Sequence, residues 1–201
     1  MQATVKFRSM FKLYQHALSR RPYLMQAIQS GGLMGAGDLI SQTLIENKTF
    51  KDVDYKRTCQ FASIGLFVGG PALRVWYGVL QQYIGTQGKA VALKKVLVDQ
   101  IVFAPTFLFT ILATVGTMQG KNWDTVKTDI KANYMDVLKT NYLIWPWVQL
   151  VNFYYVPLQY QVLIVQSVAL FWNTYLSWKT NRKISTQDNT SSKAVNGEVT
   201  Q

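Results

Sequence analysis

The chain has 201 residues, of which 49% are apolar and 15% are charged, and its formal net charge is +11. Soluble domains carry about 25% charged residues, so the composition disfavours an ordinary soluble domain. The excess Lys and Arg residues do not form a basic face with a groove-entering helix, which argues against direct nucleic-acid binding.

A basic segment is expected over residues 1–21, and no acid occurs before residue 38. Its basic residues are Lys6, Arg8, Lys12, Arg20 and Arg21. This composition resembles that of a mitochondrial targeting segment. Basic residues beside neutral spans also suit anionic lipid headgroups, at about 1 kcal/mol for each cation. A merely solvated basic tail is the alternative.

The first two membrane spans are expected over residues 22–45 and 55–82. The first contains one carboxylate, Asp38, and the second contains one guanidinium, Arg74. Glycines spaced four residues apart in a span let a neighbouring backbone approach closely. This spacing predicts helix-packing faces at four positions: Gly31, Gly35, Gly65 and Gly69.

A third span is expected over residues 91–118, where Asp99 and Gln100 are the notable polar residues. After it, residues 121–139 place apolar side chains at helical spacing, with Lys and Asp on the other face. Such an amphipathic helix is predicted to lie along the membrane surface rather than to cross the membrane.

A neutral tract of 39 residues, 140–178, is expected to contain the fourth span. One helix of this length would reach about 58 Å at about 1.5 Å per residue. This is about twice the hydrocarbon thickness, so the tract must be broken or partly interfacial. Its amides Gln149 and Asn152 lie three residues apart and share one helical face. The chain has four predicted helix breaks: Pro71, Pro105, Pro146 and Pro157.

These features predict an all-α fold, an integral membrane bundle of four transmembrane helices plus a surface amphipathic helix. The membrane domain is expected over residues 22–179, followed by a disordered polar tail over residues 180–201. A buried soluble core is the alternative explanation of the neutral tracts.

Six polar side chains inside the spans form a candidate pore or polar network: Asp38, Arg74, Asp99, Gln100, Gln149 and Asn152. An ionisable group at mid-depth costs at least about 2.5–3.5 kcal/mol, so these side chains should face the bundle interior or water. The two acids and the arginine could partly neutralise one another. The set either lines a solute path or holds helices together. We find no nucleophile motif, metal-ligand spacing or cofactor loop, so no enzyme activity, metal or cofactor is expected.

Several stretches carry a family resemblance. They are "RPYLMQAIQSGGLMGAGDLISQ", "GPALRVWYGVL", "LKKVLVDQIVFAP" and the pattern W-P-x-x-Q-x-x-N-F-x-x-V-P over 145–157. Together they resemble the Mpv-seventeen / peroxisomal membrane protein family, in order, over about residues 13–179. Many members have His where this chain has Arg74, and Trp where it has Tyr142. Both departures resemble the mitochondrial branch rather than the peroxisomal branch.

The resemblance implies a four-span protein of the mitochondrial inner membrane, with the peroxisomal membrane as the alternative location. It also implies a channel of low selectivity for small solutes or ions. Such a channel would support membrane potential, metabolite or nucleotide-precursor homeostasis, the stress response and, indirectly, mitochondrial DNA maintenance. The expected partners are the lipid bilayer, a small solute or ion and, as an open alternative, further copies of the chain. The competing hypothesis is a non-conducting scaffold that assembles partner proteins through its glycine-rich helix faces.

Overall fold

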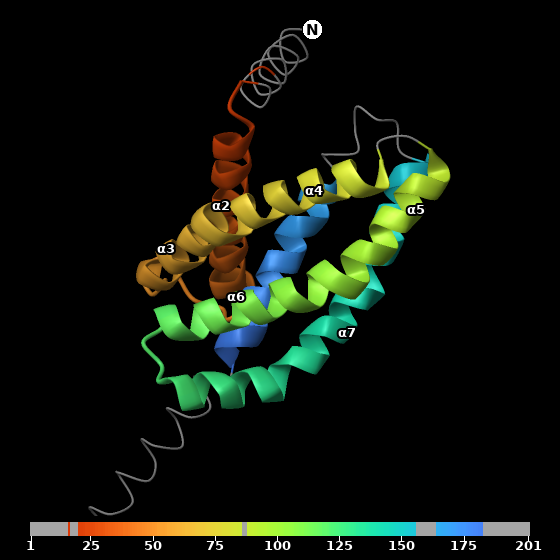
Figure 1. The fold of residues 1–201 in the computed structure, drawn as a ribbon. Coiled ribbons are helices and arrows are strands. Elements are labelled where there is room, and N and C mark those ends of the chain that lie inside the picture. Colours follow the sequence, from red (N-terminus) through yellow and green to blue (C-terminus); the bar gives the residue numbers. More distant parts are fainter. Residues whose placement is uncertain (1–15, 17–19, 86–87, 156–163, 183–201) are drawn as a thin grey trace, which may run out of the picture.

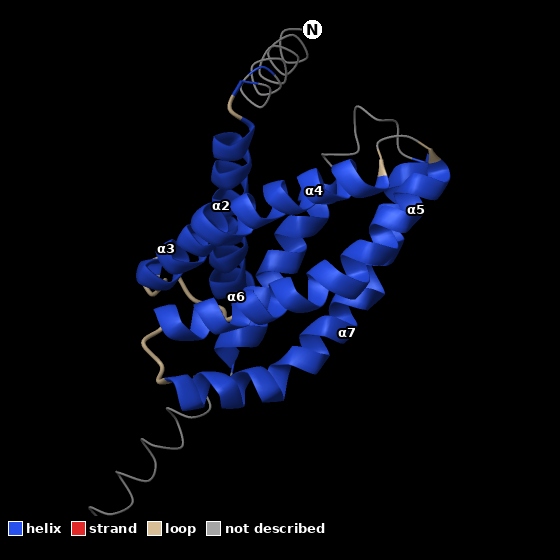
Figure 2. Ribbon diagram, viewed as in Figure 1, coloured by secondary structure: helices blue, strands red, loops and turns tan. Residues whose placement is uncertain are grey.

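The computed structural model describes residues 16, 20–85, 88–155 and 164–182. Every regular element within these ranges is a helix, which confirms the all-α prediction (Figure 2). Most of the predicted basic segment, Pro157 and nearly all of the predicted polar tail lie outside the described residues, as does the side chain of Asn152.

The predicted first span is occupied by α2 (Pro22–Ile40) and a π-helical turn, η1 (Ser41–Ile45). Pro22 fits the first turn of α2, because no amide donor is needed there. In η1 the amide of Glu46 donates to the carbonyl of Ser41 at 2.9 Å, five residues back, so the last turn is wider than an α-helical turn.

The second and third predicted spans form two long helices that run in opposite directions (Figure 1). The first is built from α3 (Tyr55–Ile64), η2 (Gly65–Gly69) and α4 (Gly70–Ile84). The second is built from α5 (Lys89–Val98), η3 (Asp99–Phe103) and α6 (Ala104–Met118).

Both long helices have the length and apolar composition needed to cross a membrane, over Tyr55–Ile84 and Ala90–Met118. Only 28% and 33% of their most apolar stretches are buried inside the protein. Large apolar side chains such as Phe67 and Ile101 remain more than two-thirds exposed, at 73% and 71%. The core helix of a soluble protein would bury such residues, so this exposure favours contact with lipid.

Each long helix contains a π-helical turn just before a proline. In η2 the amide of Gly70 donates to the carbonyl of Gly65, five residues back, and Pro71 follows. The same arrangement in η3 precedes Pro105. Proline lacks an amide and its ring collides with the carbonyl four residues earlier, so a wider turn allows the helix to continue. The expected breaks at these two prolines are therefore local wide turns within continuous helices.

The helix α7 (Trp123–Tyr155) joins the predicted surface helix to the start of the neutral tract. Pro146 lies inside α7 and does not end it, and Figure 1 shows α7 bending along its length. The apolar face of its first half is buried, with Val126 against Gly116 of α6. This face therefore covers α6, whereas the sequence suggested that it would lie on lipid.

Residues 164–178 of the neutral tract lie in a helix over residues 164–182, drawn in blue in Figure 1. It packs antiparallel to α7, because Trp172 contacts Trp145 with ring centroids 6.3 Å apart and Lys179 pairs with Asp136 at 2.9 Å. The described parts of the 39-residue tract thus lie in two antiparallel segments. This division explains how a tract about twice as long as the membrane is thick fits the fold.

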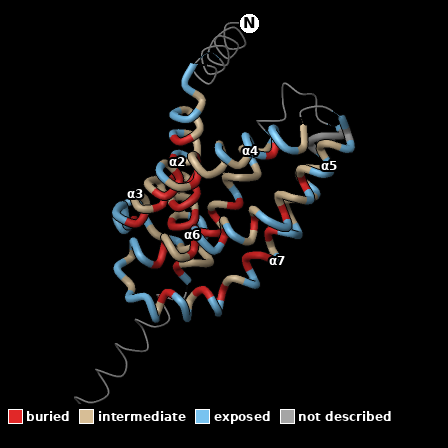
Figure 3. The backbone as a smooth tube through the Cα atoms, in the orientation of Figure 1, coloured by how far each residue is buried: buried red, intermediate tan, exposed pale blue. Residues whose placement is uncertain are grey.

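A close helix contact joins α2 to α3 and η2. A Cβ added at Gly65 would lie 2.5 Å from the carbonyl oxygen of Ser30, and one at Gly31 would lie 2.9 Å from the carbonyl oxygen of Ala62. Gly35 and Gly69 lie at the same contact. The backbones touch here because these residues have no side chains. Figure 3 shows buried residues gathered around α2 and α3.

Candidate functional site

A cavity of about 200 Å³ lies between α2, α4, the η3–α6 segment, α7 and the 164–182 helix. Most of its polar groups are side-chain amides: Gln26, Gln29, Gln100, Asn141, Gln149, Gln166 and Asn173. Asp99 supplies the carboxylate, and the described lining residues include no Lys, Arg or His. A water needs at least about 10–15 Å³ of such space, so the cavity has room for several waters or a small solute.

Aromatic rings form part of the cavity wall. Phe103 stacks on Phe107 with ring centroids 4.8 Å apart, and Trp76 stacks on Phe103 at 5.0 Å. Trp145 and Trp172 line the wall formed by α7 and the 164–182 helix. Apolar walls with a few polar groups are typical of sites for small molecules.

A chain of hydrogen bonds across three helices fixes Asp99 at the cavity wall. Trp76 Nε1 donates to Asp99 Oδ1 at 2.8 Å, and Gln100 Nε2 donates to Asp99 Oδ2 at 3.0 Å. Asn141 Nδ2 donates to Gln100 Oε1 at 2.9 Å, and the Tyr142 hydroxyl donates to the Gln100 carbonyl at 3.0 Å. Each carboxylate oxygen therefore has a donor. The wide turn of η3 begins at Asp99, and such turns occur frequently at functional sites.

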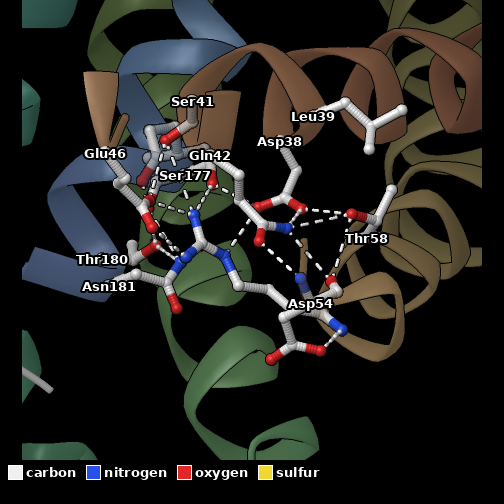
Figure 4. Close-up of polar contacts among 12 residues, drawn as sticks. Asp38, Leu39, Ser41, Gln42, Glu46, Asp54, Thr58, Ser177, Thr180 and Asn181 are labelled. Carbon is white, nitrogen blue, oxygen red and sulfur yellow. Dashed lines mark hydrogen bonds and ion pairs between the residues drawn. The ribbon is translucent and has the colours of Figure 1, made fainter. Parts of the chain in front are cut away.

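A second polar region, the Asp38 cluster, lies where α2, η1, α3 and the 164–182 helix meet (Figure 4). Its members are Asp38, Gln42, Glu46, Arg57, Thr58 and Ser177. Asp38 is completely buried. Its carboxylate accepts hydrogen bonds from Arg57 Nε at 2.7 Å and from Ser177 Oγ at 2.6 Å. Gln42 and Thr58 donate to its other oxygen at 2.8 and 2.6 Å.

Arg57 extends the cluster toward its edge. Its guanidinium donates to both carboxylate oxygens of Glu46, at 2.6 and 3.0 Å. Burial alone would raise the pKa of Glu46, but hydrogen bonds and charge attraction from Arg57 and Lys48 outweigh it, so the pKa lies below its ordinary value. The buried carboxylate of Asp38, by contrast, accepts four hydrogen bonds, one of them from its ion-pair partner Arg57. It is fully satisfied and has no acceptor free for a ligand.

The six predicted polar residues occupy different regions. Asp99, Gln100 and Gln149 line the cavity, whereas Asp38 belongs to the Asp38 cluster. Arg74 lies in neither region, because its guanidinium stacks over the Tyr23 ring at 5.3 Å and its Nε has no hydrogen-bond partner among the described residues. The expected neutralisation by Arg74 was therefore wrong for Asp38, whose cation is Arg57, at the start of the second span.

Sequence reasoning missed several residues of both regions: Gln26, Gln29, Trp76, Asn141, Gln166, Asn173, Arg57 and Ser177. A signal was present for some of them. Gln26 and Gln29 lie three residues apart, and Gln166 and Asn173 lie seven apart, so each pair shares one face of an otherwise apolar helix. Within the described residues, no group of three or more His, Cys, Asp or Glu side chains could hold a metal ion.

Comparison with known proteins gives consistent similarities. A family model described as Mpv17 / PMP22 family matches residues 116–177. The chain is 43% identical over 174 residues to the human mitochondrial inner membrane protein Mpv17, covering 87% of this chain and 99% of that protein. It is 42% identical over 173 residues to the Xenopus laevis protein of the same name, covering 86% and 98%.

A fungal relative is also similar. The chain is 37% identical over 172 residues to Protein sym-1 of Neurospora crassa, covering 84% of this chain and 98% of that protein. No solved structure matches the chain.

Proposed function

This chain belongs to the Mpv17 / PMP22 family and resides in the mitochondrial inner membrane, and from that premise we propose that it is a channel of low selectivity for small solutes or ions. The observation that carries the proposal is the cavity lined by amides and Asp99 in the interior of a bundle whose long helices leave apolar side chains exposed. We further propose that α2, the two long helices, the second half of α7 and the 164–182 helix together form the membrane-embedded bundle.

The cavity's chemistry supports low selectivity. An amide both donates and accepts hydrogen bonds, so it can bind most small polar solutes whatever the sign of their charge. Asp99 supplies a single carboxylate at the wall, whereas charge-selective pores use rings of charged side chains. Phosphate groups are usually bound by Arg, Lys or backbone amides at a helix N-terminus. The described lining offers no basic side chain. A role in nucleotide supply and mitochondrial DNA maintenance is accordingly proposed as indirect, through membrane potential and metabolite balance.

The scaffold hypothesis receives less support from the structure. It required glycine-rich faces that are free to hold partner proteins. The glycines of these faces instead contact neighbours within the same chain: Gly31, Gly35, Gly65 and Gly69. A partner could reach these glycines only after α2 had separated from α3 and η2.

Planar-bilayer recording with the purified full chain tests the proposed function. Wild-type protein should conduct potassium chloride, and Asp99→Asn should change the ratio of cation to anion permeability. Asp124→Asn is the matched control, because this carboxylate is 93% exposed and does not line the cavity. Bilayers that stay silent with folded protein would contradict the proposal.

A further inference from the structure

The Asp38 cluster lies directly beyond one end of the cavity. The cavity-lining residues of α2 run from Gln26 to Met34, and Asp38 follows one turn later. On the 164–182 helix the lining ends at Leu176, and Ser177 is the next residue. The cluster therefore follows the last lining residues on both helices.

The cavity changes in character toward this end. Four apolar and almost completely buried side chains line this end, beside the amide residue Asn173: Met34, Leu108, Ile111 and Leu176. At the opposite end, amides such as Gln26, Gln149 and Gln166 line the wall. A solute that moves toward the cluster meets first this mainly apolar layer and then a fully bonded ion pair.

We infer that the Asp38 cluster and this apolar layer form a closed gate at one end of the channel cavity. This inference rests on the proposed function. Ser177 is the link between the 164–182 helix and the ion pair of α2 and α3. Its hydroxyl donates to Asp38 Oδ1 at 2.6 Å and accepts from Arg57 Nη2 at 2.9 Å.

Close packing strengthens the seal beside this link. A Cβ added at Gly37 would lie 2.7 Å from Asn173 Cβ, so no side chain separates α2 from the 164–182 helix there. Movement of the 164–182 helix away from α2 breaks the Ser177 bonds and exposes a polar surface that a hydrated solute can follow.

Ser177→Ala tests the gate, because it removes the link and leaves the Asp38–Arg57 ion pair in place. We expect its open probability in potassium chloride to rise about tenfold over wild type, equivalent to about 1.4 kcal/mol. Glu46→Gln, which weakens the half-buried edge of the cluster, should give a smaller rise. Thr174→Val is the matched control and should leave gating unchanged. Among the described residues, this buried hydroxyl on the same helix bonds only to the Leu170 carbonyl, at 2.9 Å.

Circular dichroism and thermal unfolding in detergent establish that each variant is folded. The gate is overturned if folded Ser177→Ala opens no more often than wild type, or if Thr174→Val opens as often as Ser177→Ala. Should Ser177→Ala fail to fold, Glu46→Gln decides: an open probability equal to wild type overturns the gate. If wild type and all variants are silent, the proposed channel function is contradicted. If only the gate proposal is wrong, wild-type protein still conducts and Asp99→Asn still changes the ratio of cation to anion permeability.

Discussion

The cavity and the Asp38 cluster are both polar regions inside an apolar bundle, but they use their polar groups differently. In the cluster, Asp38 is completely buried and forms an ion pair with Arg57, so the polar groups of the cluster bond to one another. In the cavity, amide side chains and the carboxylate of Asp99 line the wall, and Asp99 accepts hydrogen bonds from the neutral donors Trp76 and Gln100. The comparison teaches that pairing and burial, rather than polarity alone, separate residues that hold helices together from residues that can meet a solute.

The largest expected effect comes from breaking the cluster's ion pair with Arg57→Met. Removing one partner of a buried pair leaves an uncompensated charge, so the free energy of unfolding should fall by about 3–5 kcal/mol. Thermal or denaturant unfolding in detergent measures the loss. Lys127→Met is the control, since its pair with Asp124 is exposed and should contribute about 1 kcal/mol or less. Equal losses in both variants would contradict the contrast between buried and exposed pairs.

The helix contact beside the cluster should be nearly as sensitive. In Gly65→Ala the new Cβ would lie 2.5 Å from the Ser30 carbonyl oxygen, so backbones must separate. Such overpacking typically costs about 1–3 kcal/mol. Gly78→Ala is the control, because a Cβ there meets nothing within 4 Å, and alanine should be neutral or stabilising by up to about 1 kcal/mol. Comparable unfolding midpoints for the two variants would remove the close contact from the account.

On the cavity side, Trp76→Phe should have a smaller effect on stability. It deletes one of the two donors to Asp99 and keeps an aromatic ring against Phe103, so a cost of about 1 kcal/mol is expected for the lost hydrogen bond. Freed of this bond, the carboxylate can reorient, and the permeability ratio should differ from wild type. Trp147→Phe, whose ring is 65% exposed, should change neither property. An unchanged ratio in folded Trp76→Phe would show that the hydrogen-bond chain does not set the position of Asp99.

The smallest effect is the pH dependence of the cluster's edge. Because the folded-state pKa of Glu46 lies below its ordinary value of 4.5, its ionised form favours folding. This stabilisation is present above pH 4.5 and is lost as the pH falls through the lowered folded pKa. Glu46→Gln should therefore lose less stability than wild type on acidification, as unfolding titrations in detergent can measure, with Asp124→Asn as the charge control. A wild type and Glu46→Gln with parallel profiles would refute this role.

Local features of the sequence predicted the outlines of the helices. Expected spans over 22–45, 55–82 and 91–118 agree with the observed helices to within about two residues, since apolar runs and flanking charges are read locally. Two long helices have the length and apolar composition needed to cross a membrane, and the expected set of four spans stays a prediction.

Contacts distant in sequence could not be predicted in the same way. Arg57 looked like a charge at the start of a span, and only the crossing of α2 and α3 brings it to Asp38. Ser177 lies 139 residues from Asp38 and has no unusual neighbours in the sequence. The two described segments of the neutral tract meet where Trp145 contacts Trp172, a pairing that periodicity does not specify.

The central claim is that the cavity is the aqueous path, and thiol accessibility tests it most directly. In a Cys59→Ser background, cysteine replaces either Gln149, which lines the cavity, or Leu143, which is 72% exposed on the outer surface of the same helix. Both variants are treated with a water-soluble thiol reagent during bilayer recording. The cavity account predicts that Gln149→Cys reacts and its conductance is blocked, while Leu143→Cys stays unmodified in lipid and conducts as before. Block at Leu143→Cys with none at Gln149→Cys would place the path outside this cavity.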